Sequence, residues 1–140
     1  MTVRQPGLKT RLALETKRIS SQHRQLDALY ELVVDAVNHR LGAAARSAFE
    51  RFHDALDAHL SLEEELYFPA LNGMRPELRE ELDGLCEEHV TLREKLDAIA
   101  HVLQEYPLEE SVPLLEDMAN TIANHEGREE LLLSRIRPGG

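Results

Sequence analysis

The sequence predicts an all-α fold, an up-down-up-down antiparallel bundle of four helices. Apolar residues recur at alternating steps of three and four along four segments, which is the period of a helix face buried against neighbours. Aromatic residues are few and strand-like alternation is missing, whereas Leu, Ala and Glu abound. The turns between the segments are short, so consecutive helices are expected to be antiparallel neighbours. A chain of 140 residues is long enough for one domain with a real core.

The first helix is expected to begin near Thr10, a suitable N-cap, and to run past His39 to a stop at Gly42. Residues 1–9 are interpreted as a polar lead-in. The apolar face of this helix contains a single strongly polar member among Ile19, His23, Leu26, Tyr30, Val33 and Val37.

The second helix is expected over residues 43–71. Pro69 lacks a backbone donor, so we expect it to kink or end the helix near Phe68, and Asn72-Gly73 closes the segment. The predicted inward face carries two ionisable residues one turn apart and reads Phe49, Phe52, Leu56, His59, Glu63, Leu66 and Ala70.

The third helix is expected to start at Pro76 and to end at Tyr106-Pro107. Its face is aliphatic apart from one histidine: Leu78, Leu82, Leu85, His89, Leu92, Leu96, Ile99 and Leu103.

Ser111 and Pro113 open the fourth helix, whose face again holds a His followed four residues later by a Glu: Leu114, Met118, Ile122, His125, Glu129, Leu132 and Ile136. The bundle is therefore predicted over residues 10–137, with 138–140 as a tail.

The polar residues on these four faces are predicted to lie at one height. We place the turns at Gly42, Gly73 and Pro107 and count the residues from each turn to the histidine on either side. The counts are 19 and 17 for His23 and His59, 14 and 16 for His59 and His89, and 18 and 18 for His89 and His125. A mismatch of two residues is about 3 Å at a rise of about 1.5 Å per residue. The layer consists of His23, His59, Glu63, His89, His125 and Glu129.

This layer predicts a metal site. Burying carboxylates without cationic partners costs several kcal/mol each, and no Lys or Arg lies on these faces. A His and a Glu four apart share one helix face, so each of two helices can offer a nitrogen to one metal and a carboxylate to the gap between two metals. The lone histidines then complete two nitrogens per metal, a mixed set that suits iron and also accepts zinc, manganese or cobalt in vitro. The alternative is a hydrogen-bonded polar layer that fixes helix register.

Composition excludes other classes. The formal net charge is −10, which argues against nucleic acid or an anionic membrane as a partner. No apolar run approaches the roughly 18 to 20 residues needed to span a bilayer, and the first twenty residues lack the apolar core of a signal peptide. The single cysteine, Cys86, cannot form an internal disulfide and fits a reducing compartment. We therefore expect a cytoplasmic protein.

The runs HLSLEEELYFP (from His59) and HEGREE (from His125), preceded by His23 and separated by His89, resemble the hemerythrin-like, or HHE cation-binding, domain. The resemblance covers roughly residues 10–137. It implies a four-helix bundle with a non-haem di-iron centre and an oxo or hydroxo bridge, in which Glu63 and Glu129 bridge the irons. It also implies that His23 and His59 serve one iron, and His89 and His125 the other.

One departure from the oxygen carriers of that family bears on function. Those proteins have a fifth histidine one turn from the ligand on the third helix, where this sequence has Leu85 and Arg93. The four-histidine set is similar to bacterial proteins linked to nitric oxide stress and iron-sulfur cluster repair and to iron-sensing domains. The resemblance thus favours redox or nitrosative chemistry over reversible oxygen storage.

Three functional hypotheses follow. The first is a di-iron protein that binds, senses or reacts with dioxygen, nitric oxide or peroxide; sensing would need a redox or signalling partner. The second is an enzyme or iron donor that uses the same ligands in nitrosative or oxidative stress and cluster repair. The third is a helical interaction module that needs no metal. Among residues beside the layer, Tyr30 and Tyr67 are interpreted as core residues, with hydrogen bonding to the ligands or gating as the alternative. Cys86 is interpreted as an inert buried thiol, with a redox or metal-adjacent thiol as the alternative.

Overall fold

The computed structural model describes residues 8–135 and consists there of four helical rods. The first rod is α1 (Leu8–Asn38). The second is continuous and combines α2 (Gly42–Leu62), a π-helical turn (Glu63–Tyr67) and α3 (Phe68–Met74). The third begins with a 3₁₀ turn (Pro76–Leu78) that leads into α4 (Arg79–Glu105), and the fourth with a 3₁₀ turn (Leu108–Ser111) that leads into α5 (Val112–Ser134).

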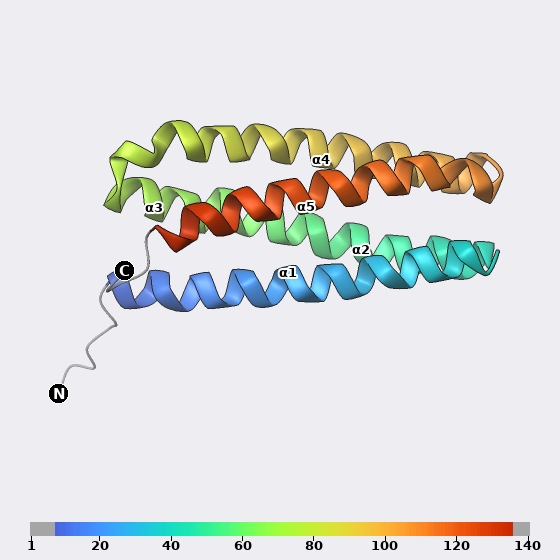
Figure 1. Cartoon of the computed structure of the whole chain (residues 1–140), viewed down its shortest axis with the longest axis horizontal. Helices are drawn as coiled ribbons and strands as arrows, with labels where there is room; N and C mark the ends of the chain where they lie inside the picture. The colour runs from blue at the N-terminus through green and yellow to red at the C-terminus, as the bar shows by residue number, and fades with distance from the viewer. Residues whose placement is uncertain (1–7, 136–140) are drawn as a thin grey trace.

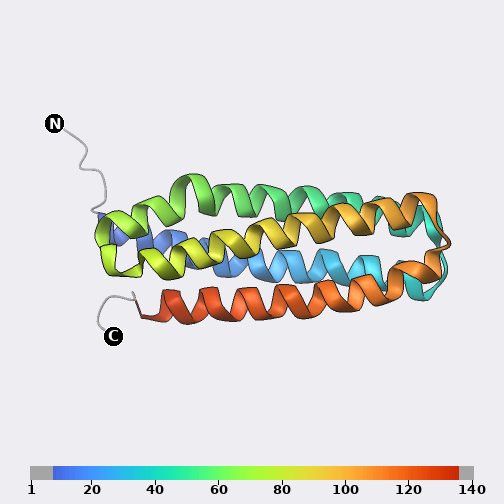
Figure 2. The same cartoon turned by 90° about the horizontal axis from the view of Figure 1, so that it is seen from above.

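The rods lie side by side and alternate in direction, as Figures 1 and 2 show from two sides. Each rod contacts the next, and α5 returns to contact α1, so the bundle closes on itself. The predicted all-α four-helix bundle is confirmed. Within the described part of the chain, no helix combines the length and the apolar character that crossing a bilayer requires.

The predicted inward faces of α1, α4 and α5 are the buried faces, apart from Tyr30 and Leu114, which are half-buried. Ile136 lies outside the described residues, as do residues 1–7 of the expected lead-in and the expected tail. Helix α1 begins at Leu8, two residues before the expected start, a difference within the usual scatter of helix ends. The domain boundaries at residues 10 and 137 stay predictions.

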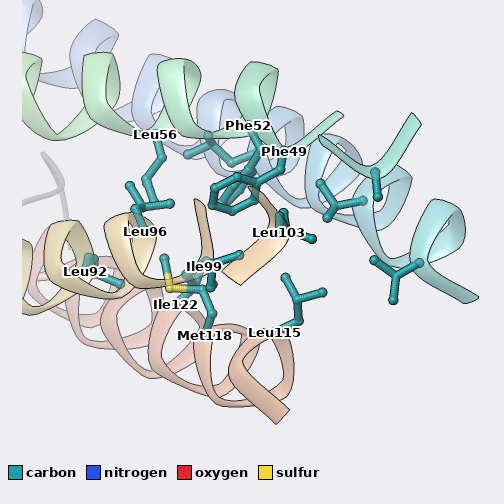
Figure 3. Close-up of a cluster of buried hydrophobic side chains, with 14 of the residues drawn as sticks. Phe49, Phe52, Leu56, Leu92, Leu96, Ile99, Leu103, Leu115, Met118 and Ile122 are labelled. Carbon is teal, nitrogen blue, oxygen red and sulfur yellow. The ribbon is translucent and has the colours of Figure 1, made fainter. Parts of the chain in front are cut away.

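The core consists of two apolar clusters rather than one. The larger lies toward the α1–α2 and α4–α5 turns, where Phe49, Phe52 and Leu56 of α2 point toward side chains of α4 and α5 (Figure 3). The smaller lies toward the opposite end and includes Ile19 of α1 and Tyr67. Between the two clusters lies the level of the predicted polar layer, because Leu85 belongs to the smaller cluster, Leu92 to the larger, and His89 lies between them.

The second rod differs from its prediction after Glu63. Leu66 and Ala70 were expected to face inward. Leu66 is 46% exposed and Ala70 is half-buried against the smaller cluster, while Tyr67 and Leu71 are buried. The cause is the π-helical turn: the Phe68 amide bonds to the Glu63 carbonyl five residues back, so one extra residue enters the helix and the inward face moves by one position. Pro69 favours this widening, since it lacks a donor and its ring would crowd the carbonyl four residues earlier. The proline widens the rod and does not end it.

The expected helix stop at Gly42 is also wrong. Gly42 is the first residue of α2, and the left-handed position that ends α1 is Arg40, with φ of 57°. The Leu41 amide bonds to Ala36 O and the Arg40 amide to Val37 O, the two hydrogen bonds of a Schellman cap. Glycine usually occupies that position, because a residue with a Cβ atom is sterically strained in the left-handed conformation that Arg40 adopts here.

Candidate metal centre

The six predicted residues converge between the two apolar clusters. Their side chains form two overlapping groups, in each of which the potential ligand atoms all lie within 4.8 Å of one another. One group contains His23 and His59, the other His89 and His125, and both contain Glu63 and Glu129. All six residues are at most 5% exposed. The structure thus brings the six residues to one level, as the turn offsets predicted.

The inward atoms are the Nε2 nitrogens and the two carboxylates. His23 Nε2 lies 3.0 Å from Glu129 Oε1 and His125 Nε2 lies 3.5 Å from Glu129 Oε2. On the other side, His59 Nε2 and His89 Nε2 lie 3.6 and 3.1 Å from Glu63 Oε1. Each carboxylate therefore reaches one histidine of each group, which is the placement a bridging carboxylate needs.

These inward atoms have no hydrogen-bond partner. All four Nε2 atoms and all four oxygens of Glu63 and Glu129 are buried without one. An unpartnered buried polar group costs about 1–3 kcal/mol, and a charged one more. Buried nitrogen and carboxylate atoms that converge without hydrogen-bond partners fit a bound cation.

The outward nitrogen of each imidazole faces one residue of a neighbouring rod. His59 Nδ1 and His125 Nδ1 donate to Gln22 Oε1 and Glu88 Oε1 at 2.6 and 2.7 Å. His23 Nδ1 lies 3.4 Å from Glu130 Oε1, and His89 Nδ1 lies 3.5 Å from Glu64 Oε1. We name these four residues the outer acceptors: Gln22, Glu64, Glu88 and Glu130.

The outer acceptors form a ring around the bundle. Each one directly precedes or follows a layer residue of its own rod and faces the histidine of the adjacent rod. The acceptor on α1 faces the histidine on α2, that on the second rod faces α4, that on α4 faces α5, and that on α5 faces α1. A proton held on Nδ1 by such an acceptor leaves the Nε2 lone pair directed inward, which is the tautomer a metal requires.

Arginines fix two of the outer acceptors. Arg93 donates to both oxygens of Glu64, at 2.8 and 2.9 Å, and lowers the pKa of that carboxyl. Arg128 donates to Glu88 Oε2 at 2.7 Å. Burial raises the pKa of Glu88, but Arg128 and His125 outweigh it, so the net shift is downward. Both carboxylates that face His89 and His125 are therefore ionised and held in place.

The histidines differ in their affinity for protons. Burial lowers the pKa of His59 and of His89 to about 4, so both are neutral at pH 7. Burial also lowers the pKa of His23 and His125, but the Glu129 carboxylate outweighs that effect and their pKa values are raised. The two buried carboxyls also differ in pKa. Burial and the neighbouring Glu129 raise the pKa of Glu63 to about 12, whereas Glu63, His125 and His23 outweigh burial at Glu129 and lower its pKa.

A comparison with known families decides the identity of the fold. The model of the hemerythrin HHE cation-binding domain matches residues 15–136. The chain belongs to this family. No curated protein and no solved structure matches it significantly. The chain is therefore a cation-binding helical protein of the hemerythrin HHE family, while iron, the number of ions and the four-histidine type remain predictions.

Tyr30, Tyr67, Cys86 and the three remaining histidines are not among the six layer residues. The Tyr30 hydroxyl donates to Leu115 O and its ring packs on Phe52, which agrees with a core role. Tyr67 is buried in the smaller cluster, and Cys86 is a half-buried thiol beside that cluster whose pKa burial raises. His39, His53 and His101 belong to neither group of potential ligands.

Sequence reasoning missed the outer acceptors and the π-helical turn. The helix pattern assigns no role to Glu64, yet this residue is half-buried against His89 and Arg93. The π-helical turn also brings Phe68 onto the His89 ring, stacked at 5.6 Å between centroids, which fixes the plane of that imidazole. Polar residues directly beside layer residues were the available signal for the outer acceptors.

Proposed function

We propose that the six layer residues bind two iron ions bridged by Glu63 and Glu129. The observation that carries this proposal is the overlap of the two groups, which share both carboxylates and differ only in their histidines. Two nitrogens and two oxygens per position suit iron and admit zinc or manganese. We assign His23 and His59 to one ion, and His89 and His125 to the other.

The chain's own residues prepare this site in three ways. The outer acceptors of His23, His59 and His125 hold the Nδ1 protons, so those inward nitrogens keep their lone pairs. The apolar clusters above and below exclude bulk water, which strengthens each ligand's attraction for a cation. The arginines at Glu64 and Glu88 keep two outer acceptors in register with their histidines.

We further propose that the centre binds or reacts with dioxygen, nitric oxide or peroxide. A bound iron pair would supply open coordination positions and electrons to such a ligand. The support is the donor count: Leu85 is buried in the smaller cluster and Arg93 is engaged by Glu64 and Asp57, so neither adds a ligand where the oxygen carriers have a fifth histidine. Fewer protein ligands leave more room for an exogenous one.

Metal analysis and optical spectroscopy test this proposal on protein from iron-supplemented cells. We expect close to one iron for each of the two groups, a near-ultraviolet band of a bridged ferric pair, and a new spectrum after nitric oxide is added to the reduced protein. His59→Ala should lose iron, and His101→Ala, an exposed histidine away from the layer, should retain it. Wild-type protein with no metal above trace would end the proposal.

A catalytic role is the second candidate, favoured by the same open positions. Steady-state consumption of nitric oxide or peroxide by the iron form, lost in Glu63→Ala, would separate turnover from binding alone. For either role we propose a cytoplasmic setting, supported by the free Cys86, together with a redox or signalling partner.

A further inference from the structure

A groove between α1 and α2 reaches one residue of the layer, His59. Its volume is about 320 Å³, and Gln22 and His59 form part of its lining. The rest of the lining is largely apolar, including Leu26 and Leu29 of α1 and Ala55 of α2. A larger cavity of about 540 Å³ between α2 and α4 is lined by residues such as His53 and Leu103 and reaches none of the six layer residues.

The chemistry of the groove is selective. Acidic residues outnumber basic ones by 26 to 16 in this chain, yet no carboxylate is among the described residues that line the groove. A hydrated cation moving through a protein is stabilised by carboxylates. This lining therefore suits a small neutral molecule better than a metal ion.

Gln22 extends this lack of carboxylates to the layer itself. It is the one outer acceptor without a carboxylate, and its Oε1 accepts the Nδ1 proton of His59 at 2.6 Å. The other three histidines face Glu64, Glu88 and Glu130. Of the four outer acceptors, the groove therefore contacts Gln22, whose side chain holds His59 without adding negative charge.

We propose that this groove is the route by which a small neutral molecule, of the class of dioxygen or nitric oxide, reaches the metal position of His23 and His59. Gln22 is the positioning residue that holds the His59 ring at the inner end. The proposal rests on the proposed function for the presence of iron. His59 is 5% exposed, so the last step requires side-chain fluctuations, which occur in nanoseconds to microseconds.

The first test needs no iron. Paramagnetic relaxation by dissolved dioxygen is measured on leucine methyl groups of the full chain in a diamagnetic form, with zinc or without metal. The methyl groups of Leu26, Leu29 and Leu62, which line the groove, should relax several-fold faster than those of Leu85, which is buried in the smaller cluster. Ala55→Phe, which fills the groove, should remove the difference. Equal relaxation at all four leucines, or no effect of Ala55→Phe, would overturn the route.

The second test uses the iron form and stopped-flow mixing with nitric oxide. Ala55→Phe should slow association at least tenfold while iron content and resting spectrum stay unchanged. Ala100→Phe is the matched control, because Ala100 is also a partly buried alanine packed on the larger cluster but lines the other cavity. Should Ala55→Phe fold poorly, Ala58→Phe blocks the same groove from an exposed position.

The two tests keep the proposals apart. Absence of iron would refute the proposed function, while the dioxygen measurement would still decide the route. Unchanged nitric oxide association in a filled groove, or slower iron loading in place of slower association, would refute the route and leave the di-iron proposal standing.

Discussion

Replacing Glu63 by methionine should change stability in opposite directions with and without metal. Glu63 is fully buried, and neither of its oxygens has a hydrogen-bond partner. Removing two such atoms relieves about 1–3 kcal/mol each. Glu129 would lose its neighbour in return, so we expect metal-free Glu63→Met to be more stable than metal-free wild type by about 2 kcal/mol, at the low end of that range. For a chain of this length, this is roughly a 6 °C rise in melting temperature.

With iron the order should reverse. An ion bound a thousandfold above its dissociation constant stabilises the folded state by about 4 kcal/mol, and loss of a bridging ligand removes most of that gain. Melting curves followed by circular dichroism, with iron and with chelator, measure both differences. Glu65→Met is the matched control, because Glu65 is exposed on the same rod and should shift stability by less than about 0.5 kcal/mol. Stabilisation by Glu63→Met under both conditions would favour a metal-independent module, and destabilisation under both would refute the cost assigned to the unpartnered oxygens.

Three further predictions follow from the same geometry. Without metal, stability should change little from pH 4.5 to 6.5, because two groups raise it and two lower it as pH increases. His59 and His89, with pKa values near 4 when folded against 6.5 unfolded, raise it, and Glu63 and Glu126, with pKa values of about 12 and about 7 when folded against 4.5 unfolded, lower it. Stability should then fall toward alkaline pH, since the contribution of Glu63 declines as pH increases; urea titrations would contradict the assignment if stability rose above pH 7. Gln22→Leu should weaken metal binding about 10–100-fold in competition with a chromophoric chelator, because His59 loses its outer acceptor, and unchanged affinity would show that Gln22 does not orient the ring. Arg40→Gly should stabilise the fold by about 1 kcal/mol in urea denaturation, because glycine adopts the left-handed conformation without strain; a loss of stability would mean that the arginine side chain contributes more than its backbone costs.

The metal layer could be predicted from sequence because it depends on two regular quantities. Helix periodicity places His89 on the same face as Leu85 and Leu92, and short turns fix the relative heights of neighbouring rods. Neither quantity depends on side-chain packing detail.

The outer acceptors could not be predicted in the same way. A residue beside a ligand lies on the flank of its rod, and which neighbour it faces depends on the handedness of the bundle. Alternating hydropathy does not encode handedness, so Gln22 has no pattern that directs it to His59 in place of a residue on α5. The ring becomes visible only when all four rods are placed together.

The local backbone departures were beyond sequence for a different reason. Pro69 indicated a disturbance of the helix, but a kink, a helix end and a wider π-helical turn would each accommodate its missing backbone donor. Widening prevails here because it buries Tyr67 and Leu71 and leaves Leu66 outside. Similarly, Gly42 had the residue type of a helix stop, yet the spacing of the turn placed Arg40 at the left-handed position.

Anomalous diffraction at the iron absorption edge, on crystals of iron-loaded protein, tests the central claim most directly. We expect two peaks inside the bundle, one beside His23 and His59 and one beside His89 and His125, with Glu63 and Glu129 between them. A map with no peak at this level, or with the six side chains directed away from a common centre, would contradict the account.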